Sequence, residues 1–210
     1  MAKNRIDFMI FFERLKNKIY GKVKYDENFF SNDWFSNWKN LKFILKEIIE
    51  INNDWKTILD YGCGPGIMID FMNDNGFKYY GYDSSTHAHQ LYLEKFGKYL
   101  ENYLVSYEKI YDYNYDLCVS FDVFEHMTDQ QITDSISKMK NIKYFLFNIS
   151  REKGIPGHIN IKNDEEWVDI FHSIGLKFDK EFTKNVRTKY KNIKPDLTEL
   201  WQKNIFVFKN

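Results

Sequence analysis

Residues 57–66 of the chain read Thr-Ile-Leu-Asp-Tyr-Gly-Cys-Gly-Pro-Gly. The apolar beginning predicts a strand that ends at Asp60, and the glycine-dense turn leads into an apolar helix. Gly62, Gly64 and Gly66 have no Cβ atom, so the backbone can adopt positive φ and approach a ligand closely, while the first amides of the helix offer hydrogen-bond donors. In an open parallel sheet, ligands bind outside the carboxyl end of a strand. The stretch therefore predicts a pocket for a nucleotide-type cofactor.

The spacing of the glycines distinguishes between cofactors. A dinucleotide turn has the pattern G-x-G-x-x-G, which requires glycine at position 67, where Ile67 stands. The chain has G-x-G-x-G with Asp60 two residues ahead, which resembles motif I of the class I S-adenosylmethionine-dependent methyltransferases. The resemblance implies S-adenosyl-L-methionine as cofactor and S-adenosyl-L-homocysteine as product. It places Asp60, Gly62, Gly64 and Gly66 at the cofactor and ranks an NAD-dependent oxidoreductase last.

A second acid follows the next predicted strand. Residues 78–83 read Lys-Tyr-Tyr-Gly-Tyr-Asp, and Asp83 is suited to accept hydrogen bonds from both hydroxyls of a ribose. Ser84 comes directly after it and is a further cofactor-binding candidate. Methyltransferases and NAD-dependent enzymes both use such an acid, so Asp83 predicts nucleoside binding without separating them.

A third segment favours the methyltransferase. The apolar strand candidate 115–121 is followed by Asp-Val-Phe-Glu-His, which resembles the D-x-x-E-H motif that many methyltransferases carry after the fourth strand. Asp122, Glu125 and His126 stand at i, i+3 and i+4, so on a helix they share one face at the mouth of the pocket. We also assign Asp122 to the cofactor side.

The alternation of predicted strands and helices indicates a parallel α/β sheet. Strands are expected near 57–61, 78–83, 102–106, 115–121 and 142–149, and helices near 66–74, 85–97, 128–140 and 163–174. Two further strands, 176–183 and 204–209, are expected to be joined by a polar loop without a full-length helix. Because short connections join antiparallel neighbours, the last strand is expected to be reversed. The resemblance implies an α/β, three-layer, Rossmann-like sheet of seven strands, mostly parallel with the last antiparallel.

The methyltransferase domain is expected to span 55–210, and we interpret 1–54 as an N-terminal helical cap. Apolar positions recur at helical spacing in 6–20, and 41–51 is a further helix candidate. The aromatic-rich segment 25–38 is interpreted either as a lid over cofactor and substrate or as a satellite hydrophobic cluster.

Composition limits the classes of function. A chain of 210 residues is long enough for one sizeable core. Its formal net charge of zero argues against a general nucleic-acid binder. The cysteines Cys63 and Cys118 form no C-x-x-C pair, and no apolar run approaches the length of a membrane span. We expect a cytoplasmic protein that acts on a small molecule, with no nucleic-acid or membrane partner.

Methyl transfer requires an acceptor held in line and, for an oxygen or neutral nitrogen, removal of a proton. His126 and His158 are the catalytic candidates, because an imidazole titrates near neutral pH and both are expected beside the pocket. Either histidine is equally well explained as a side chain that supports a loop.

The same region offers a metal-binding alternative. Asp122, Glu125, His126 and His158 form a mixed oxygen and nitrogen set that suits magnesium or manganese. The pattern is similar to that of small-RNA 2′-O-methyltransferases and ubiquinone-biosynthesis O-methyltransferases, which bind a divalent cation, but those enzymes have Glu in place of Asp122. We therefore expect no metal requirement. Metal-assisted transfer to a catechol-like or ribose hydroxyl remains an alternative, as does a catalytically silent partner subunit that binds S-adenosylmethionine.

Two further segments concern the adenine and the acceptor. The third strand is not followed by the acid that often contacts the adenine amino group, so Ser106 or Tyr107 is expected to replace it. The predicted loop 184–202 is basic through Lys184, Arg187, Lys189, Lys191 and Lys194. It is interpreted either as a solvated loop or as a site for an anionic acceptor, such as a nucleotide sugar, a phosphorylated metabolite or a glycan precursor.

Overall fold

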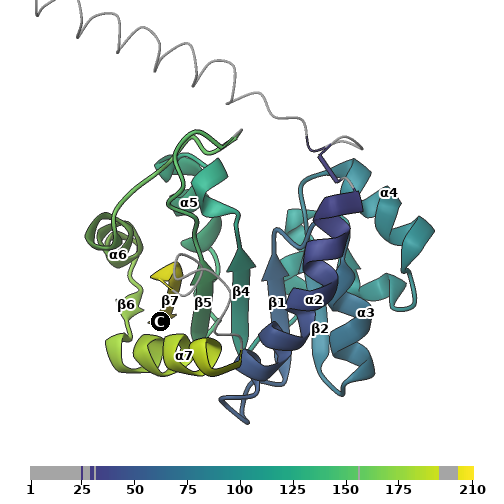
Figure 1. The fold of residues 1–210 in the computed structure, drawn as a ribbon, viewed down its shortest axis with the longest axis horizontal. Coiled ribbons are helices and arrows are strands. Elements are labelled where there is room, and N and C mark those ends of the chain that lie inside the picture. The colour runs from purple at the N-terminus through teal and green to yellow at the C-terminus, as the bar shows by residue number, and fades with distance from the viewer. Residues whose placement is uncertain (1–24, 26–28, 31, 156, 194–202) are drawn as a thin grey trace, which may run out of the picture.

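The computed structural model describes residues 25, 29–30, 32–155, 157–193 and 203–210, with the side chains of these residues except 32–40 and 193. Its centre is a seven-stranded sheet (Figure 1) formed by β1 (Thr57–Tyr61), β2 (Lys78–Tyr82), β3 (Tyr103–Leu104), β4 (Leu117–Phe121), β5 (Tyr144–Asn148), β6 (Lys177–Phe178) and β7 (Ile205–Lys209). The α-helices are α2 (Asn32–Ile49), α3 (Ile67–Asp74), α4 (Thr86–Lys95), α5 (Asp129–Ile136), α6 (Asp164–Ser173) and α7 (Lys180–Ile193). Short 3-10 helices lie at Leu100–Asn102, Tyr107–Asp112 and Phe124–His126.

The strand order is β3-β2-β1-β4-β5-β7-β6, and β7 runs antiparallel to both of its neighbours. The remaining neighbouring strands pair in parallel. This arrangement confirms the predicted mostly parallel sheet with a reversed last strand. The chain order reverses between β1 and β4, and a sheet of this type binds ligands at that switch point.

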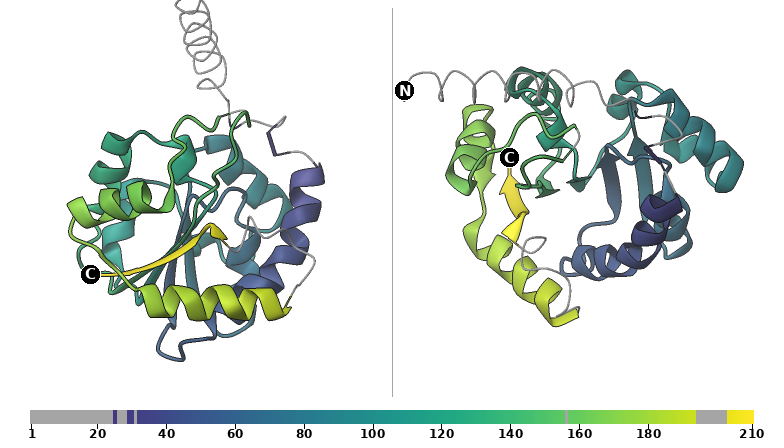
Figure 2. Two further views of the ribbon diagram at one scale, coloured as in Figure 1. Left: turned by 60° about the vertical axis from the view of Figure 1, so that its left-hand side comes forward. Right: turned by 45° about the horizontal axis from the view of Figure 1, so that its top comes forward.

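Two hydrophobic clusters, one on each face of the sheet, make up most of the core. Along a strand, successive side chains point to opposite faces. Accordingly Leu117 and Val119 belong to the cluster under α2, α3 and α7, whereas Cys118 belongs to the cluster under α5 and α6. Helices therefore cover both faces (Figure 2), and the central strands are buried on both sides. This explains their continuous apolar sequences.

Helix α2 is part of this core. Its C-terminal half buries Ile44, Leu45, Ile48 and Ile49, which pack in the same cluster as β1. The helix overlaps the predicted helix 41–51, but it begins earlier, at Asn32, and ends at Ile49. The predicted helix 6–20 lies outside the described residues. Among the described helices, none combines the length and the apolar character that crossing a membrane requires.

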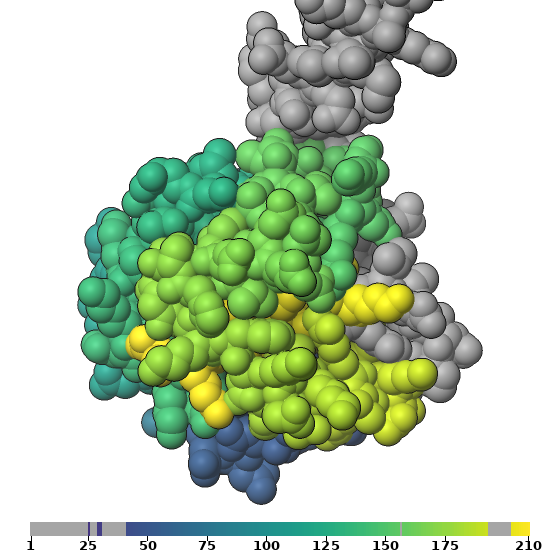
Figure 3. All heavy atoms as spheres, turned by 90° about the vertical axis from the view of Figure 1, so that its left-hand side faces the viewer, coloured from purple at the N-terminus to yellow at the C-terminus, as the bar shows by residue number. Residues whose placement is uncertain are grey.

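The region before β7 differs from the prediction. The expected strand 176–183 is only two residues long, and the expected loop is helical up to Ile193, while 194–202 lie outside the described part of the chain. The cause is an apolar stripe at four-residue spacing, Phe182, Val186 and Tyr190, which the basic residues between them obscured. Helices α6 and α7 cover much of the C-terminal segment, whose yellow atoms appear in patches between them and beside them (Figure 3).

The third strand is also shorter than predicted. Only Tyr103 and Leu104 pair with β2, and 3-10 helices flank them on both sides. The other predicted elements are present, with ends that differ from the structure by up to four residues.

Where the short β6 has ended, residues at and just before the start of α7 form hydrogen bonds with the outer edge of β7. The Val207 amide donates to Thr183 Oγ1 at 2.9 Å, and the Asp179 amide donates to the Val207 carbonyl at 2.8 Å. Thr183 is 2% exposed, so water does not replace this acceptor.

Thr183→Val keeps the shape of the side chain but leaves the buried Val207 amide without its acceptor. We expect the free energy of unfolding to fall by about 1–3 kcal/mol, the cost of an unsatisfied buried donor. Urea unfolding measures this change. The control is Thr188→Val, on an exposed position of the same helix. Equal stability of the two variants would contradict the role assigned to Thr183.

Candidate active site

The glycine turn after β1 adopts left-handed backbone conformations. Gly62, Gly64 and Gly66 have φ values of 84°, 53° and 71°, which residues with a Cβ atom rarely adopt. A Cβ at Gly62 would also lie 2.3 Å from Val123 Cγ2. The Gly62 and Cys63 amides donate to the Tyr82 carbonyl at 2.7 and 3.1 Å, so the turn is fixed to the end of β2.

Asp83 connects the same two strand ends through its side chain. Its Oδ2 accepts a hydrogen bond from the Gly64 amide at 2.9 Å, and its Oδ1 accepts one from the Ser85 amide at 2.8 Å. Burial raises the pKa of this carboxyl, and the two backbone hydrogen bonds act in the opposite direction. A carboxylate offers about four acceptor positions, so each oxygen keeps one for a ligand hydroxyl.

Asp60 is the buried acid of the site, at 4% exposure. The Tyr79 hydroxyl donates to its Oδ2 at 3.0 Å. Burial raises the pKa of Asp60 to about 7; the Tyr79 hydrogen bond lowers this pKa, and the charge of Asp83 raises it further. A positively charged ligand nearby would favour the ionised form of this carboxyl.

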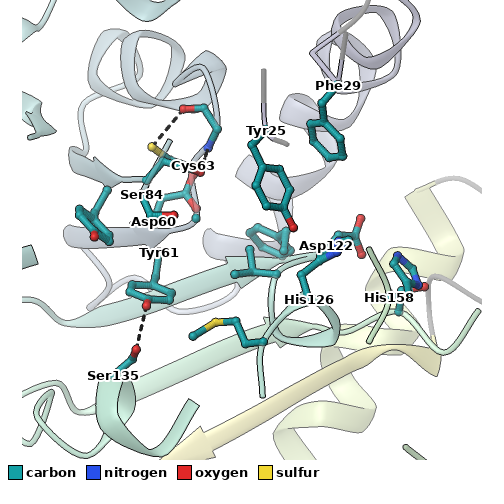
Figure 4. Close-up of a pocket in the computed structure, with 18 of the residues that line it drawn as sticks. Tyr25, Phe29, Asp60, Tyr61, Cys63, Ser84, Asp122, His126, Ser135 and His158 are labelled. Carbon is teal, nitrogen blue, oxygen red and sulfur yellow. Dashed lines mark hydrogen bonds between the residues drawn. The ribbon is translucent and has the colours of Figure 1, made fainter. Parts of the chain in front are cut away.

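A cavity of about 690 Å³ lies at the carboxyl ends of the central strands (Figure 4). Its lining includes most of the predicted site residues: Asp60, Gly62, Gly64, Asp83, Ser84, Asp122, His126 and His158. Gly66, Ser106 and Tyr107 are not among the described lining residues. A Cβ at Gly66 would lie 2.6 Å from Tyr92, so Gly66 allows the close packing of α4. The assignment of Ser106 to the adenine stays a prediction. Tyr107 instead donates to the Ser135 carbonyl at 2.6 Å.

The D-x-x-E-H segment is not an α-helix. Asp122 has a φ of 54°, the single positive value among the described non-glycine residues, and a short 3-10 helix follows it. Glu125 is fully buried, and its Oε1 accepts a hydrogen bond from the Ser150 amide at 3.0 Å. Its carbonyl accepts from the amides of Ile159 and Asn160. Glu125 thus organises the loop after β5 and does not line the cavity.

His126 and His158 face each other at the cavity, with ring centroids 4.8 Å apart (Figure 4). His158 Nδ1 lies 2.9 Å from the Glu152 carbonyl, which requires that this nitrogen carry the proton. No hydrogen bond fixes the tautomer of His126, whose buried Nδ1 has no partner among the described residues. A neutral imidazole keeps one nitrogen with a free lone pair, and in His158 this nitrogen is Nε2.

Both histidines are neutral. Burial, followed by the neighbouring His158, lowers the pKa of His126 to about 4. Burial likewise lowers the pKa of His158, although the Glu152 carbonyl partly opposes this shift. Neutral imidazoles are proton acceptors across the physiological range.

Two aromatic residues that precede α2, Tyr25 and Phe29, line the cavity on the side of His126. Tyr25 lies edge-to-face with Phe29 at 4.8 Å and with His126 at 5.9 Å. Ser85 Oγ donates to the Tyr25 carbonyl at 2.7 Å and so holds the segment to the start of α4. Tyr25 and Phe29 line the cavity and also pack against the small cluster that contains Phe30, so the segment fits both interpretations given for it. Nothing in the sequence indicated Asn204, which also lines the cavity.

The basic residues of the predicted loop lie elsewhere, on α7. Arg187 donates to the carbonyls of Ile205 and Lys203, and Lys189 is 3.7 Å from Glu47. None of the described basic residues of α7 lines the cavity, and Lys194 lies outside the described residues. Arg187 and Lys189 thus hold the helix to β7 and to α2, and the interpretation of these basic residues as an anion site stays a prediction.

Comparison with known proteins assigns the family. A family model described as a methyltransferase domain matches residues 38–147, more than half of the chain, and the protein therefore belongs to the methyltransferase-domain family. The resemblance to class I S-adenosylmethionine-dependent methyltransferases is thus confirmed. None of the curated proteins compared with the chain is similar to it in sequence.

Solved structures share the fold at low sequence identity. A SAM-dependent methyltransferase from Archaeoglobus fulgidus is 17% identical with a TM-score of 0.54, over 81% of this chain and 92% of that one. Magnesium protoporphyrin IX methyltransferase from Synechocystis, solved with bound SAM, is 18% identical with a TM-score of 0.54, over 80% and 82%. A TehB-like methyltransferase from Corynebacterium glutamicum is 14% identical with a TM-score of 0.54, over 88% and 100%.

The low pKa of His126 is measurable by NMR. Because burial disfavours the imidazolium, we expect the His126 ring protons to keep their neutral-form shifts down to about pH 5 and to titrate near 4. In urea the same protons should titrate near about 6.5. The folded pKa is the lower one, so unfolding takes up protons between these values, and stability falls as the pH decreases through that window. A folded-state midpoint near 6.5 would contradict the geometry described for His126.

Proposed function

We propose that the protein transfers the methyl group of S-adenosyl-L-methionine to an oxygen or nitrogen atom of a small molecule. The observation that carries this proposal is the cavity of about 690 Å³, which joins the glycine turn and Asp83 on one side to two neutral histidines on the other. Its volume is typical of a site for small ligands. A large acceptor would have to remain mostly outside it.

The cofactor side fits S-adenosylmethionine in shape and in charge. The turn leaves space above the end of β1, and each oxygen of Asp83 has an acceptor position for a ribose hydroxyl. Asp60 offers a buried negative charge, and no described Lys or Arg lines the cavity. These features suit a ligand with net positive charge. When bound, the cofactor supplies a methyl carbon on a sulfonium, and the broken carbon–sulfur bond leaves its electron pair on sulfur.

The histidine side is suited to receive a proton. Both histidines line the cavity, and each neutral imidazole has one nitrogen with a free lone pair. In His158 this nitrogen is Nε2, because the Glu152 carbonyl holds Nδ1. An acceptor hydroxyl or amine that binds there loses its proton to one of these nitrogens as its own lone pair forms the new bond to carbon. Tyr25 and Phe29 support the further proposal that the N-terminal segment closes over the site and excludes water.

One observation favours metal-assisted transfer as a second candidate. Each of Glu125, His126 and His158 offers a ligand atom within 4.8 Å of the others. Nδ1 of His158 donates to the Glu152 carbonyl, as is usual for histidines that bind metals. Against this, burial and the charge of Asp122 raise the pKa of Glu125 well above its ordinary value, and a protonated carboxyl is a poor ligand. Asp122, predicted as a fourth ligand, does not belong to this cluster.

Asp83→Ala tests the cofactor assignment. Removing the acceptors for the ribose hydroxyls should weaken S-adenosylmethionine binding by about 1.5–3 kcal/mol, the usual scale for hydrogen bonds to a charged group. Calorimetric titration measures the affinity, and Asp169→Ala, at an exposed position of α6 outside the described lining of the cavity, is the control. Tight NAD binding by the wild type, or unchanged affinity in Asp83→Ala, would overturn the assignment.

Replacing each histidine by Asn tests the proton acceptor. If one of them is the base, its replacement should lower kcat by about 10²–10⁴ with little change in cofactor affinity. The acidic limb of the wild-type rate profile should lie near pH 4 for His126 and disappear in the variant. A homocysteine-release assay, run on a panel of small acceptors, gives the rates, and His172→Asn on α6 is the control. Near-normal kcat in both variants would make the histidines structural.

Exhaustive chelation separates metal-free from metal-assisted transfer. We expect turnover to persist in excess chelator, because Glu125 is buried, accepts the Ser150 amide and favours its protonated form. The measurement is the release rate before and after chelation, with magnesium or manganese added back. Turnover that is lost on chelation and restored by either ion would establish the second candidate.

A further inference from the structure

The acceptor side of the cavity presents hydrogen-bond acceptors that lack donors. Asn204 is 3% exposed, and its Oδ1 receives no hydrogen bond from any described residue. His126 Nδ1 is also buried and has no partner among the described residues. His158 Nε2 is the unprotonated nitrogen of its half-buried ring, because Nδ1 donates to the Glu152 carbonyl. A buried acceptor without a donor is costly, so Asn204 Oδ1 favours a ligand that brings N–H or O–H donors, and His158 Nε2 offers such a ligand a second acceptor.

The charged side chains that line the cavity also favour a ligand of this kind, and they favour positive charge on it. Asp60, Asp83, Asp122, Asp134 and Glu152 line the cavity, and no described Lys or Arg does. Burial favours the protonated forms of Asp60 and Asp83, but the three remaining carboxyls still outnumber the single net positive charge of the cofactor. An anionic acceptor would therefore meet like charge, which costs affinity and suppresses binding.

The nearest cations are engaged with other residues. Arg151 precedes Glu152 in the chain, but its guanidinium is 2.6 Å from Asp164. Lys162 is 3.2 Å from Asp129. Neither side chain is among the described lining of the cavity, so the negative charge there is not neutralised by its sequence neighbours.

Aromatic rings form the wall beside these acceptors (Figure 4). Phe29, Tyr25, His126 and His158 form a continuous series of edge-to-face contacts with centroid distances of 4.8, 5.9 and 4.8 Å. Aromatic faces attract organic cations and also bury an apolar body. A hydrated metal ion would use the acceptor atoms but not Tyr25 and Phe29, which favours an organic cation.

We propose that the methyl acceptor is a small organic amine with an apolar body, whose ammonium group is recognised by Asn204 Oδ1, Glu152 and the aromatic wall. The inference rests on the proposed function and narrows its substrate to a charge class. It replaces the expected anionic acceptor. The ammonium group is the recognition element, and its donors satisfy the acceptors that the protein leaves open.

Three probes of matched shape test this charge preference: phenethylamine, 2-phenylethanol and 3-phenylpropionate. Each is titrated into the complex with S-adenosylhomocysteine, in the presence of chelator, and binding is followed by calorimetry or ligand-observed NMR. We expect phenethylamine to bind at least about tenfold more tightly than 3-phenylpropionate, because only the ammonium gains from the carboxylates. The alcohol should lie between them.

Glu152→Gln and Asn204→Leu should each reduce this preference severalfold. Glu165→Gln, an exposed acid on α6, should leave it unchanged. Unaltered affinity for S-adenosylhomocysteine shows that each variant is folded. For Asn204, which is buried, Asn204→Asp is the second variant, and it should increase the preference for the amine.

Equal or tighter binding of 3-phenylpropionate would overturn the inference and leave the proposed function intact. Displacement of phenethylamine by manganese in chelator-free buffer would also overturn it, in favour of a metal site. Failure of the wild type to bind S-adenosylhomocysteine would instead contradict the proposed function itself.

Discussion

The hydrogen bonds between the glycine turn and the end of β2 are the constraint on which the site depends. The Gly62 and Cys63 amides share the Tyr82 carbonyl, and the Gly64 amide donates to Asp83. These bonds hold three left-handed residues in place and keep two parallel strand ends together. The space above β1 exists because three residues of the turn that follows it are glycines and place no side chain there. The position of Asp83 in the cavity follows from the same bonds.

Burial is the second determinant, because it shifts acids and bases of the site in opposite directions. It raises the pKa values of Asp60, Asp83 and Glu125 and lowers those of His126 and His158. Each shift disfavours the charged form. The apo site therefore carries less charge than its sequence suggests, and a cationic ligand is needed to stabilise its carboxylates. The same carboxyls therefore favour positive charge on the cofactor and on the proposed acceptor.

Local patterns explain which parts of the fold were predictable from sequence. The first strand was predicted with its observed bounds, because a short apolar run is followed there by an acid and a glycine-rich turn. Helix α7 was missed because its stripe of Phe182, Val186 and Tyr190 is diluted by lysines, and because its stability comes from contacts with β7 and α2. Tertiary packing here outweighed a weak local pattern.

Parts of the site were likewise predictable from the sequence, and other parts were not. The positions of Asp60, Gly62, Gly64 and Asp83 at the cavity were predictable, because each lies at a strand end or in the turn that follows it. The function of Glu125 was not, since the Ser150 amide that it binds comes from a distant loop. Nothing in the sequence indicated that Asn204 lines the cavity, because it reaches the cavity only through the reversed direction of the last strand. Contacts between distant segments are what a single sequence does not encode in any short pattern.

Proton release on cofactor binding tests the central claim, that the cavity over Asp60 receives a positively charged cofactor. With a pKa of about 7, Asp60 is about half protonated at neutral pH in the free protein. Titration of S-adenosylmethionine at pH 7 in buffers of different ionisation enthalpy should show release of roughly half a proton, and Asp60→Asn should abolish it. Binding without net proton release in the wild type would contradict the account.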